Sequence, residues 1–144
     1  MPLSLHFYNL QTQQPVHLET WQKVANQALP DCLAAAKTSD APLTNLEEVE
    51  ISFVSDEAIA QVHADFMSDP TPTDVITFHH GEILISLDTA KRQATEHGET
   101  YEREAALYVI HGLLHLAGWE DYEETERAEM HRLQSQILEK TWLK

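Results

Sequence analysis

The chain has 144 residues, of which 42 % are hydrophobic, and its 24 acidic and 9 basic side chains give a formal charge of −15. This length favours one domain, spanning residues 1–144, and the composition excludes a disordered chain. The acidic balance argues against an ordinary nucleic-acid binder, because phosphate contacts usually require a basic stripe. Residues 38–90 contain no lysine or arginine at all.

A single cysteine, Cys32, rules out an internal disulfide and fits a reducing compartment. We expect its side chain to be buried packing. The amino-terminal stretch has neither a basic region nor a long apolar run, so no signal peptide is expected. No apolar stretch approaches the roughly 18 residues of a membrane span. We therefore expect a cytoplasmic protein without a membrane partner.

The first half of the chain predicts strands and helices in alternation. A strand is expected at 3–10 and a helix at 18–37, which Pro30 kinks or breaks because proline cannot donate a backbone hydrogen bond. EVEISFV, at 48–54, alternates apolar and polar side chains as a half-buried strand does. Ser55 is placed to cap the next helix. That helix carries an expected core-facing stripe, formed by Ile59, Val62 and Phe66.

The middle of the chain predicts a rigid turn and a hairpin. DPTPTD, at 69–74, is expected to be non-helical because its prolines restrict the residues before them. Strands are expected at 74–78 and 82–86, followed by a helix at 87–96 that ends at Gly98. This order of elements predicts a small α+β fold, with about five helices packed on a mixed sheet of about four strands.

The segment 100–117 predicts the helix that carries a candidate metal site, near the carboxyl terminus. Thr100 is placed to cap this helix, and Gly118 to follow its end. His111 and His115 are four residues apart and share one face, away from the apolar arc, where two ring nitrogens can reach one ion. The partial negative charge at the carboxyl end of the helix also favours a cation.

A third ligand is expected from the turn after this helix. Zinc accepts histidine and carboxylate ligands together, and a catalytic zinc has three protein ligands and one open position. Asp121 is the first candidate and Glu120 the alternative. Asp121 also has a competing interpretation as the N-cap of a final helix, in an acidic capping box with Glu124. Three further histidines can join the site only through tertiary contacts: His79, His80 and His131.

Residue 112 is glycine, where the zinc-protease signature HExxH has its glutamate base. A protease of that kind is therefore not expected. Any general base must come from elsewhere in the chain, or the metal must generate hydroxide unaided. No catalytic residue beyond the metal ligands is assigned from the sequence.

Three blocks resemble the YbeY-type endoribonucleases and rRNA maturation factors in order and spacing. PTDVITF at 72–78 is similar to the family's PTDVLSF, GEILIS at 81–86 to its GDIxIS, and HGLLHLAGWED at 111–121 to its HGxLHLxGYDH. The similarity extends from about Asn45 to Met130. It implies a compact α+β fold, one zinc ion held by three residues, and hydrolysis of single-stranded RNA. The implied setting is late maturation of small-subunit rRNA, including the 16S rRNA 3′ end, and ribosome quality control.

The resemblance also implies the ligand set. By position, His111 and His115 match the family's first two metal histidines, and Asp121 takes the place of the third. A carboxylate reaches zinc at about 2.0–2.2 Å, much as imidazole does, so the change is chemically tolerable. It lowers the net charge of the site, and the metal should therefore acidify its water less.

A second departure concerns a Tyr-Arg pair that the family has shortly before its PTD block. The corresponding residues here are Phe66 and Met67, so a guanidinium expected to serve catalysis or phosphate binding is missing. Lys91 and Arg92 are the candidates to approach the site in space.

Several neighbouring residues have two interpretations. Thr73 and Asp74 are favoured as the cap of a strand, with direct chemistry as the alternative. His79 and His80 are expected to be exposed loop residues, with substrate binding or proton donation as the alternative. Trp119 is expected to anchor the turn after the metal helix, with base stacking as the alternative.

These observations predict a zinc-dependent single-strand endoribonuclease in rRNA maturation. Its expected partners are RNA and ribosomal proteins, and no DNA partner is expected. Two other functions stay open: a non-catalytic ribosome-assembly factor with a structural metal, and a metal hydrolase of a non-RNA substrate.

Overall fold

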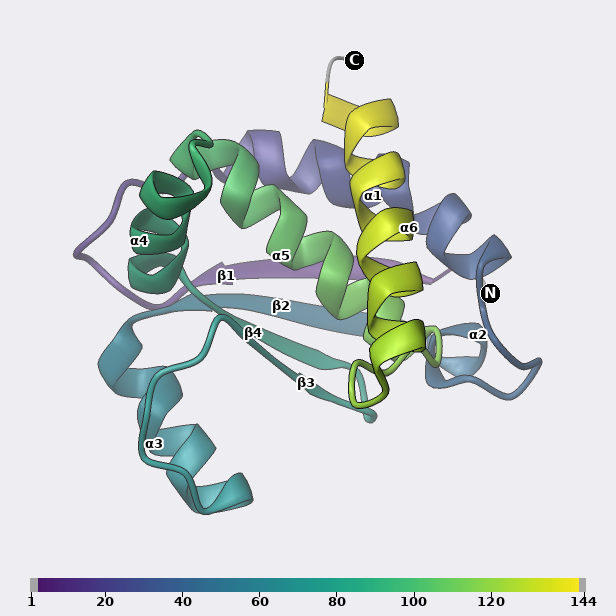
Figure 1. Cartoon of the computed structure of the whole chain (residues 1–144), viewed down its shortest axis with the longest axis horizontal. Coiled ribbons are helices and arrows are strands. Elements are labelled where there is room, and N and C mark those ends of the chain that lie inside the picture. Colours follow the sequence, from purple (N-terminus) through teal and green to yellow (C-terminus); the bar gives the residue numbers. More distant parts are fainter. Residues whose placement is uncertain (1–2, 143–144) are drawn as a thin grey trace.

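The computed structural model describes residues 3–142, so the first two and last two residues of the predicted 1–144 domain lie outside it. Within this range a four-stranded mixed sheet and six helices confirm the predicted α+β class (Figure 1). The sheet order is β1 (Ser4–Asn9), β2 (Glu48–Val54), β4 (Glu82–Ser86) and β3 (Val75–Phe78). The first three of these are parallel, and β3 is the antiparallel edge strand of the predicted hairpin.

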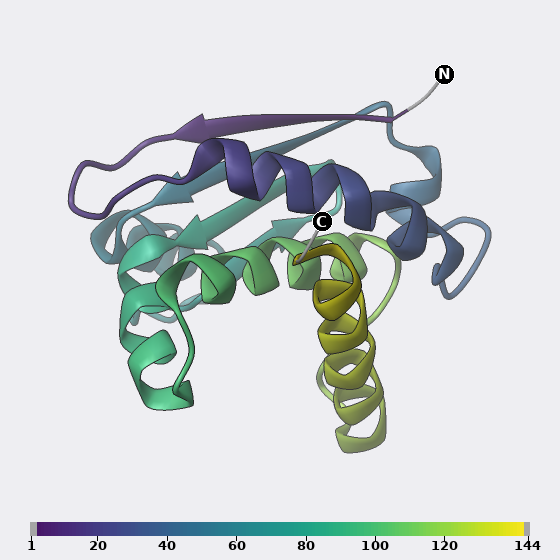
Figure 2. The same ribbon diagram turned by 90° about the horizontal axis from the view of Figure 1, so that it is seen from above.

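The helices form layers on the sheet. Helices α1 (Leu18–Ala34) and α5 (Tyr101–Leu116) cover one face, while α4 (Leu87–His97) and α6 (Glu124–Trp142) pack against α5 and extend away from the sheet (Figure 2). A short α2 (Pro42–Asn45) was not predicted, and α3 (Asp56–Met67) packs on the other face. Among residues 3–142, no helix combines the length and apolar character that a membrane crossing requires.

The main core lies between the sheet and helices α1 and α5. Trp21 of α1 is fully buried, with its ring centroid 4.8 Å from that of Phe53 and its indole N–H donating to the Glu102 carbonyl at 2.9 Å. Alternation along the strands directs the fully buried apolar side chains of β2 and β4 into this layer: Val49, Ile51, Phe53, Ile83 and Ile85.

Helix α1 runs unbroken through Pro30, so of the two predicted effects of this proline, a kink or a break, the break is wrong. Ala28 and Cys32, on either side of the proline, are fully buried. This packing holds the helix together although one backbone hydrogen bond is lost. Cys32 is buried as predicted, and desolvation raises the pKa of its thiol to about 12.

The stripe predicted on α3 is wrong at one position. Ile59 is fully buried and Val62 partly buried, but Phe66 is 69 % exposed. The reason is that the core on this face is small. It consists of Val54, Ile59, Ile76 and Leu84, and it covers the first turns of α3 but not its carboxyl end.

Helix α5 approaches β4 closely at Gly112. A Cβ atom at this position would lie 2.7 Å from Ile83 Cγ2 and 3.0 Å from Ile83 Cδ1. Glycine therefore allows α5 to lie flat on the sheet. A glutamate here, as in zinc proteases, would have to enter the core, which agrees with the exclusion of that class.

We expect Gly112→Ala to lower the free energy of unfolding by about 1–3 kcal/mol, the usual cost of overpacking. Urea denaturation measures this change. Ile83→Ala removes the clashing atoms and serves as the control, because it should cost less in the Gly112→Ala background than in the wild type. Additive effects of the two substitutions would contradict the assigned clash.

Candidate metal centre

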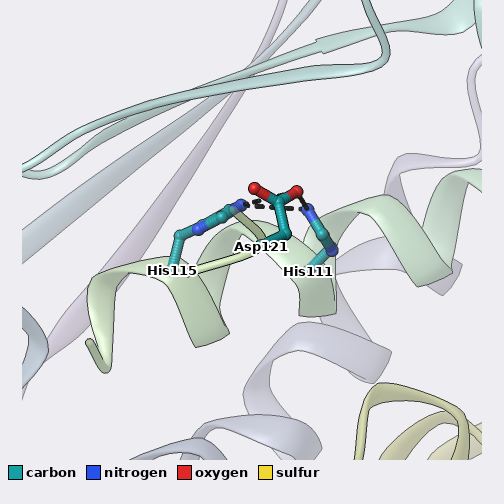
Figure 3. Close-up of side chains that lie close together, drawn as sticks. All are labelled: His111, His115 and Asp121. Carbon is teal, nitrogen blue, oxygen red and sulfur yellow. Dashed lines mark hydrogen bonds and ion pairs between the residues drawn. The ribbon is translucent and has the colours of Figure 1, made fainter. Parts of the chain in front are cut away.

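The structure brings the three predicted ligands together at the carboxyl end of α5 (Figure 3). The Nε2 atoms of His111 and His115 lie 3.0 Å apart. Asp121 Oδ2 lies 3.9 Å from the first of these nitrogens and 4.0 Å from the second. Among residues 3–142, no other group of three histidine, cysteine or acidic residues has ligand atoms this close together. The arrangement can hold a metal ion.

The turn after α5 places Asp121. Thr100 caps the start of the helix as predicted, and Gly118 reverses the chain after its end with φ +99°. Trp119 then anchors the loop, because its indole N–H donates to the Ala35 carbonyl at 2.9 Å. This confirms the anchoring role expected of Trp119.

Two oxygen acceptors fix the protonation of the imidazoles. His115 Nδ1 donates to the Trp119 carbonyl at 2.8 Å, and His111 Nδ1 donates to Gln134 Oε1 at 2.7 Å. A neutral imidazole carries one N–H, so both Nε2 atoms present lone pairs to one another. These lone pairs repel unless a cation lies between them. The donor chemistry therefore fits a metal ion.

The separations also fit one ion. Two ligand atoms at about 2 Å from a tetrahedral metal lie about 3.3 Å apart. The observed N–N and N–O distances of 3.0, 3.9 and 4.0 Å lie on either side of this value. Small side-chain adjustments are sufficient to bring all three atoms to one centre.

Electrostatics favour the neutral, ligating form of His111. Burial lowers the pKa of this imidazole, and the neighbouring His115 lowers it further. The hydrogen bond to Gln134 and the charges of Asp74 and Asp121 oppose the shift without cancelling it. Because a metal binds the unprotonated ring, the lowered pKa reduces the competition from protons.

Asp121 is not the N-cap of α6, so that competing interpretation is wrong. The Glu123 carboxylate accepts hydrogen bonds from the backbone N–H groups of Thr125 and Glu126, both at 3.0 Å. Glu123 directly precedes α6 and satisfies its first donors. The Asp121 side chain instead faces the two histidines.

The alternative ligands lie outside the group. Glu120 Oε2 is 4.0 Å from His115 Nδ1, the nitrogen that already donates to the Trp119 carbonyl. The ring of His131 is 6.4 Å from that of His111, measured between centroids. His80 is exposed as predicted and pairs with Glu82, while His79, also exposed, lines the surrounding cleft.

The candidate centre opens into a cleft of about 320 Å³ between α3, β3 and the α5–α6 loop. Met67, which takes the place of the family's arginine, lines this cleft. Neither Lys91 nor Arg92 does, and Arg92 instead pairs with Asp56. The lining residues include no lysine or arginine: His63, Met67, Thr73, Asp74, Val75, Ile76, Thr77, His79, His111, His115, Glu120, Asp121 and Tyr122.

Thr73 and Asp74 lie at the start of β3. Asp74 Oδ1 accepts a hydrogen bond from the Val75 N–H at 2.8 Å, and the Asp74 carbonyl accepts one from the Ser86 N–H at 3.0 Å. These contacts agree with the favoured strand-capping interpretation. Both residues also line the cleft.

Sequence reasoning missed Gln134, which is only 8 % exposed and holds His111 from α6. The sequence contains a signal that Gln134 has a polar partner. Gln134 falls among Met130, Ile137 and Leu138 on the buried face of α6, where a polar side chain needs a partner. The partner itself is 23 residues away, so spacing alone does not identify it.

Comparisons with known proteins agree with the fold. The family model described as Endoribonuclease YbeY matches residues 6–142. Proteins named Endoribonuclease YbeY are similar to this chain in Heliobacterium modesticaldum (33 % identity, 88 % of this chain and 87 % of that protein) and Acholeplasma laidlawii (38 %, with 68 % and 77 % covered). The solution structure of TM1509 from Thermotoga maritima has the same fold, with a TM-score of 0.63, 24 % identity, and 96 % and 89 % of the two chains covered.

We expect Asp121→Ala to weaken zinc binding by more than the roughly 10- to 100-fold caused by losing an outer hydrogen-bond partner, because it removes a ligand. Competition with a chromophoric chelator measures the affinity. Glu120→Ala is the matched control and should bind zinc as the wild type does. Equal affinity of Asp121→Ala and wild type would refute the carboxylate ligand.

We expect Gln134→Leu to weaken zinc binding by about 10- to 100-fold, since His111 loses the acceptor that orients its ring. Gln134→Glu retains an acceptor and should keep the affinity. Gln136→Leu, the same substitution at an exposed position of α6, is the control. NMR of the imidazole nitrogens should show loss of the single tautomer only in Gln134→Leu, and an unchanged tautomer would contradict the assignment.

Proposed function

This chain belongs to the endoribonuclease YbeY family, and from that premise we propose that it hydrolyses phosphodiester bonds within single-stranded RNA at the centre formed by His111, His115 and Asp121. The observation that carries the proposal is the pair of facing Nε2 lone pairs beside a carboxylate. Two facing lone pairs repel, so a cation between them would stabilise this arrangement, and the pair opens into the cleft.

We propose one zinc ion as the cofactor. Two imidazoles and one carboxylate form a donor set that zinc accepts, and three protein ligands leave a position open. When bound, zinc supplies Lewis-acid stabilisation of the charge that develops on the phosphoryl oxygens and lowers the pKa of water. His111, His115 and Asp121 would hold it, while Gln134 and the Trp119 carbonyl keep the two rings oriented.

Hydroxyl groups in the cleft support binding of a phosphodiester. The hydroxyl-bearing residues Thr73, Thr77 and Tyr122 line the cleft together with the imidazole of His63. His63 Nδ1 donates to the Thr71 carbonyl at 2.8 Å, which fixes this ring at the base of the 69–73 turn. The hydroxyls of Thr73 and Tyr122 can donate to a phosphate in place of a guanidinium.

The proposed setting is maturation of small-subunit rRNA, including the 16S rRNA 3′ end, and ribosome quality control. The formal charge of −15 supports delivery of the substrate by a basic ribosomal protein, because complementary charge steers association. The long-range field of this chain repels RNA, so an adaptor of opposite charge would bring the two together.

One observation favours a second candidate, a non-catalytic ribosome-assembly factor with a structural metal. The residues that line the cleft include no lysine or arginine, which phosphoryl-transfer sites commonly use. In cells that lack the protein, His111→Ala separates the two functions. Restored rRNA processing by this variant would identify the assembly role.

We expect a chelator to reduce cleavage of single-stranded RNA to the level of the His111→Ala variant, and added zinc to restore it. A denaturing gel with end-labelled RNA measures the products, and circular dichroism checks that the fold survives. Leu10→Ala, at a position 65 % exposed and far from the site in sequence, serves as the control and should cleave as the wild type does. Cleavage that persists in excess chelator would eliminate the metal mechanism.

A further inference from the structure

Four aromatic side chains lie in segments that border the cleft, and three of them are exposed. Phe66 at the end of α3 is 69 % exposed, and Tyr122 in the α5–α6 loop is 85 % exposed. Phe78 ends β3, and His80 follows in the hairpin turn. We name these four residues the aromatic rim. Large apolar groups exposed together usually mark a binding surface rather than a packing defect.

The rim is a built structure on the α3 side of the cleft. The ring centroids of Phe66 and Phe78 lie 5.3 Å apart at 70°, and those of Phe78 and His80 lie 5.5 Å apart and nearly parallel, at 13°. Phe78 packs against the small core under α3, so it anchors both exposed rings. Glu82 also holds the His80 ring, at 3.2 Å.

One rim residue, Tyr122, lines the cleft, and each of the other three is next in sequence to a residue that lines it. Met67, which follows Phe66, lines the cleft. His79, which lies between Phe78 and His80 in the sequence, lines it as well. Tyr122 lines the cleft from the other segment and directly follows Asp121. Aromatic rings are thus available next to the cleft on two separate segments of the chain.

The acidic charge of the chain limits which contacts can contribute to RNA affinity at this face. Among residues 3–142 no lysine or arginine lines the cleft, and residues 38–90, which include α3 and β3, contain none. Phosphate contacts therefore contribute little to affinity at this face. Stacking of bases on aromatic rings does not require positive charge, and single-stranded RNA exposes its bases for such contacts.

We propose that the aromatic rim binds the bases of single-stranded RNA that flank the phosphate to be cleaved, by stacking on Phe66, His80 and Tyr122. This inference rests on the proposed RNA cleavage and specifies how the substrate is held. It also explains the exposure of Phe66, since a ring that stacks on a ligand must leave the core. Double-stranded RNA, whose bases are already stacked, is a poor ligand for such a surface.

The test is equilibrium binding of a fluorescent single-stranded oligoadenylate, measured by anisotropy in a chelator so that the strand stays intact. Phe66→Ala and Tyr122→Ala should each weaken binding at least about fivefold, the lower end of what one base–aromatic stack contributes. Phe66→Trp should retain binding. Leu10→Ala is the matched control, because Leu10 is an exposed apolar side chain outside the rim, and it should bind as the wild type does.

Salt dependence gives a second readout that a merely structural role would not produce. The slope of log K against log salt should be shallower than about −2, because each neutralised phosphate of a single strand contributes only about −0.7 and the cleft offers no lysine or arginine. A steeper slope would show that basic residues elsewhere on the chain bind the RNA, and would overturn the proposal.

Phe66→Leu distinguishes stacking from apolar docking of a protein. It keeps an apolar side chain but removes the ring, so RNA binding should fall as far as in Phe66→Ala. Wild-type RNA affinity in Phe66→Leu or Phe66→Ala would overturn the proposal and leave a protein as the occupant of the rim. Binding in chelator requires neither metal nor cleavage, so its failure is distinct from failure of the proposed hydrolase.

Discussion

The site depends on two hydrogen bonds made by the outer nitrogens of its histidines. The Trp119 carbonyl and Gln134 Oε1 accept the Nδ1 protons of His115 and His111, which directs both Nε2 lone pairs toward one point. Without these acceptors each ring has two tautomers and free rotation, and the pair has no defined chemistry. One acceptor comes from the loop after α5 and the other from α6, so the centre forms only when the carboxyl-terminal third of the chain is folded.

The site also depends on where α5 packs in the fold. Gly112 lets the helix approach Ile83 of β4, and the apolar side of α5 is buried under α1 and the sheet. His111 and His115 occupy the remaining polar side. The same glycine that packs the helix removes the position where a zinc protease has its base. Packing and reaction class are therefore connected through one residue.

Local patterns predicted most of the fold and of the candidate site. Alternation at 48–54 and the histidine spacing on α5 placed the strand, the helix and two candidate ligands, while Asp121 was the first candidate for the third and Glu120 its alternative. The predictions that were wrong concern residues whose placement depends on tertiary contacts. The core under α3 is too small to reach Phe66, and buried neighbours hold α1 together across Pro30. The N-cap of α6 is Glu123 and not Asp121. Either carboxylate satisfies the local pattern, and only the loop geometry determines which one caps the helix.

The acidic composition and an RNA substrate are compatible if binding and chemistry use different forces. A chain of charge −15 cannot concentrate RNA by its long-range field, so attraction must act at short range. A cation held by His111, His115 and Asp121 would supply one local positive charge, and the exposed rings beside the cleft would supply contacts that salt does not screen. Binding of this kind is selective for unpaired strands, because only they offer both a reachable phosphate and free base faces. The long-range repulsion then contributes to specificity, since structured RNA is repelled by the charge of the chain and has no free bases to offset that repulsion by stacking.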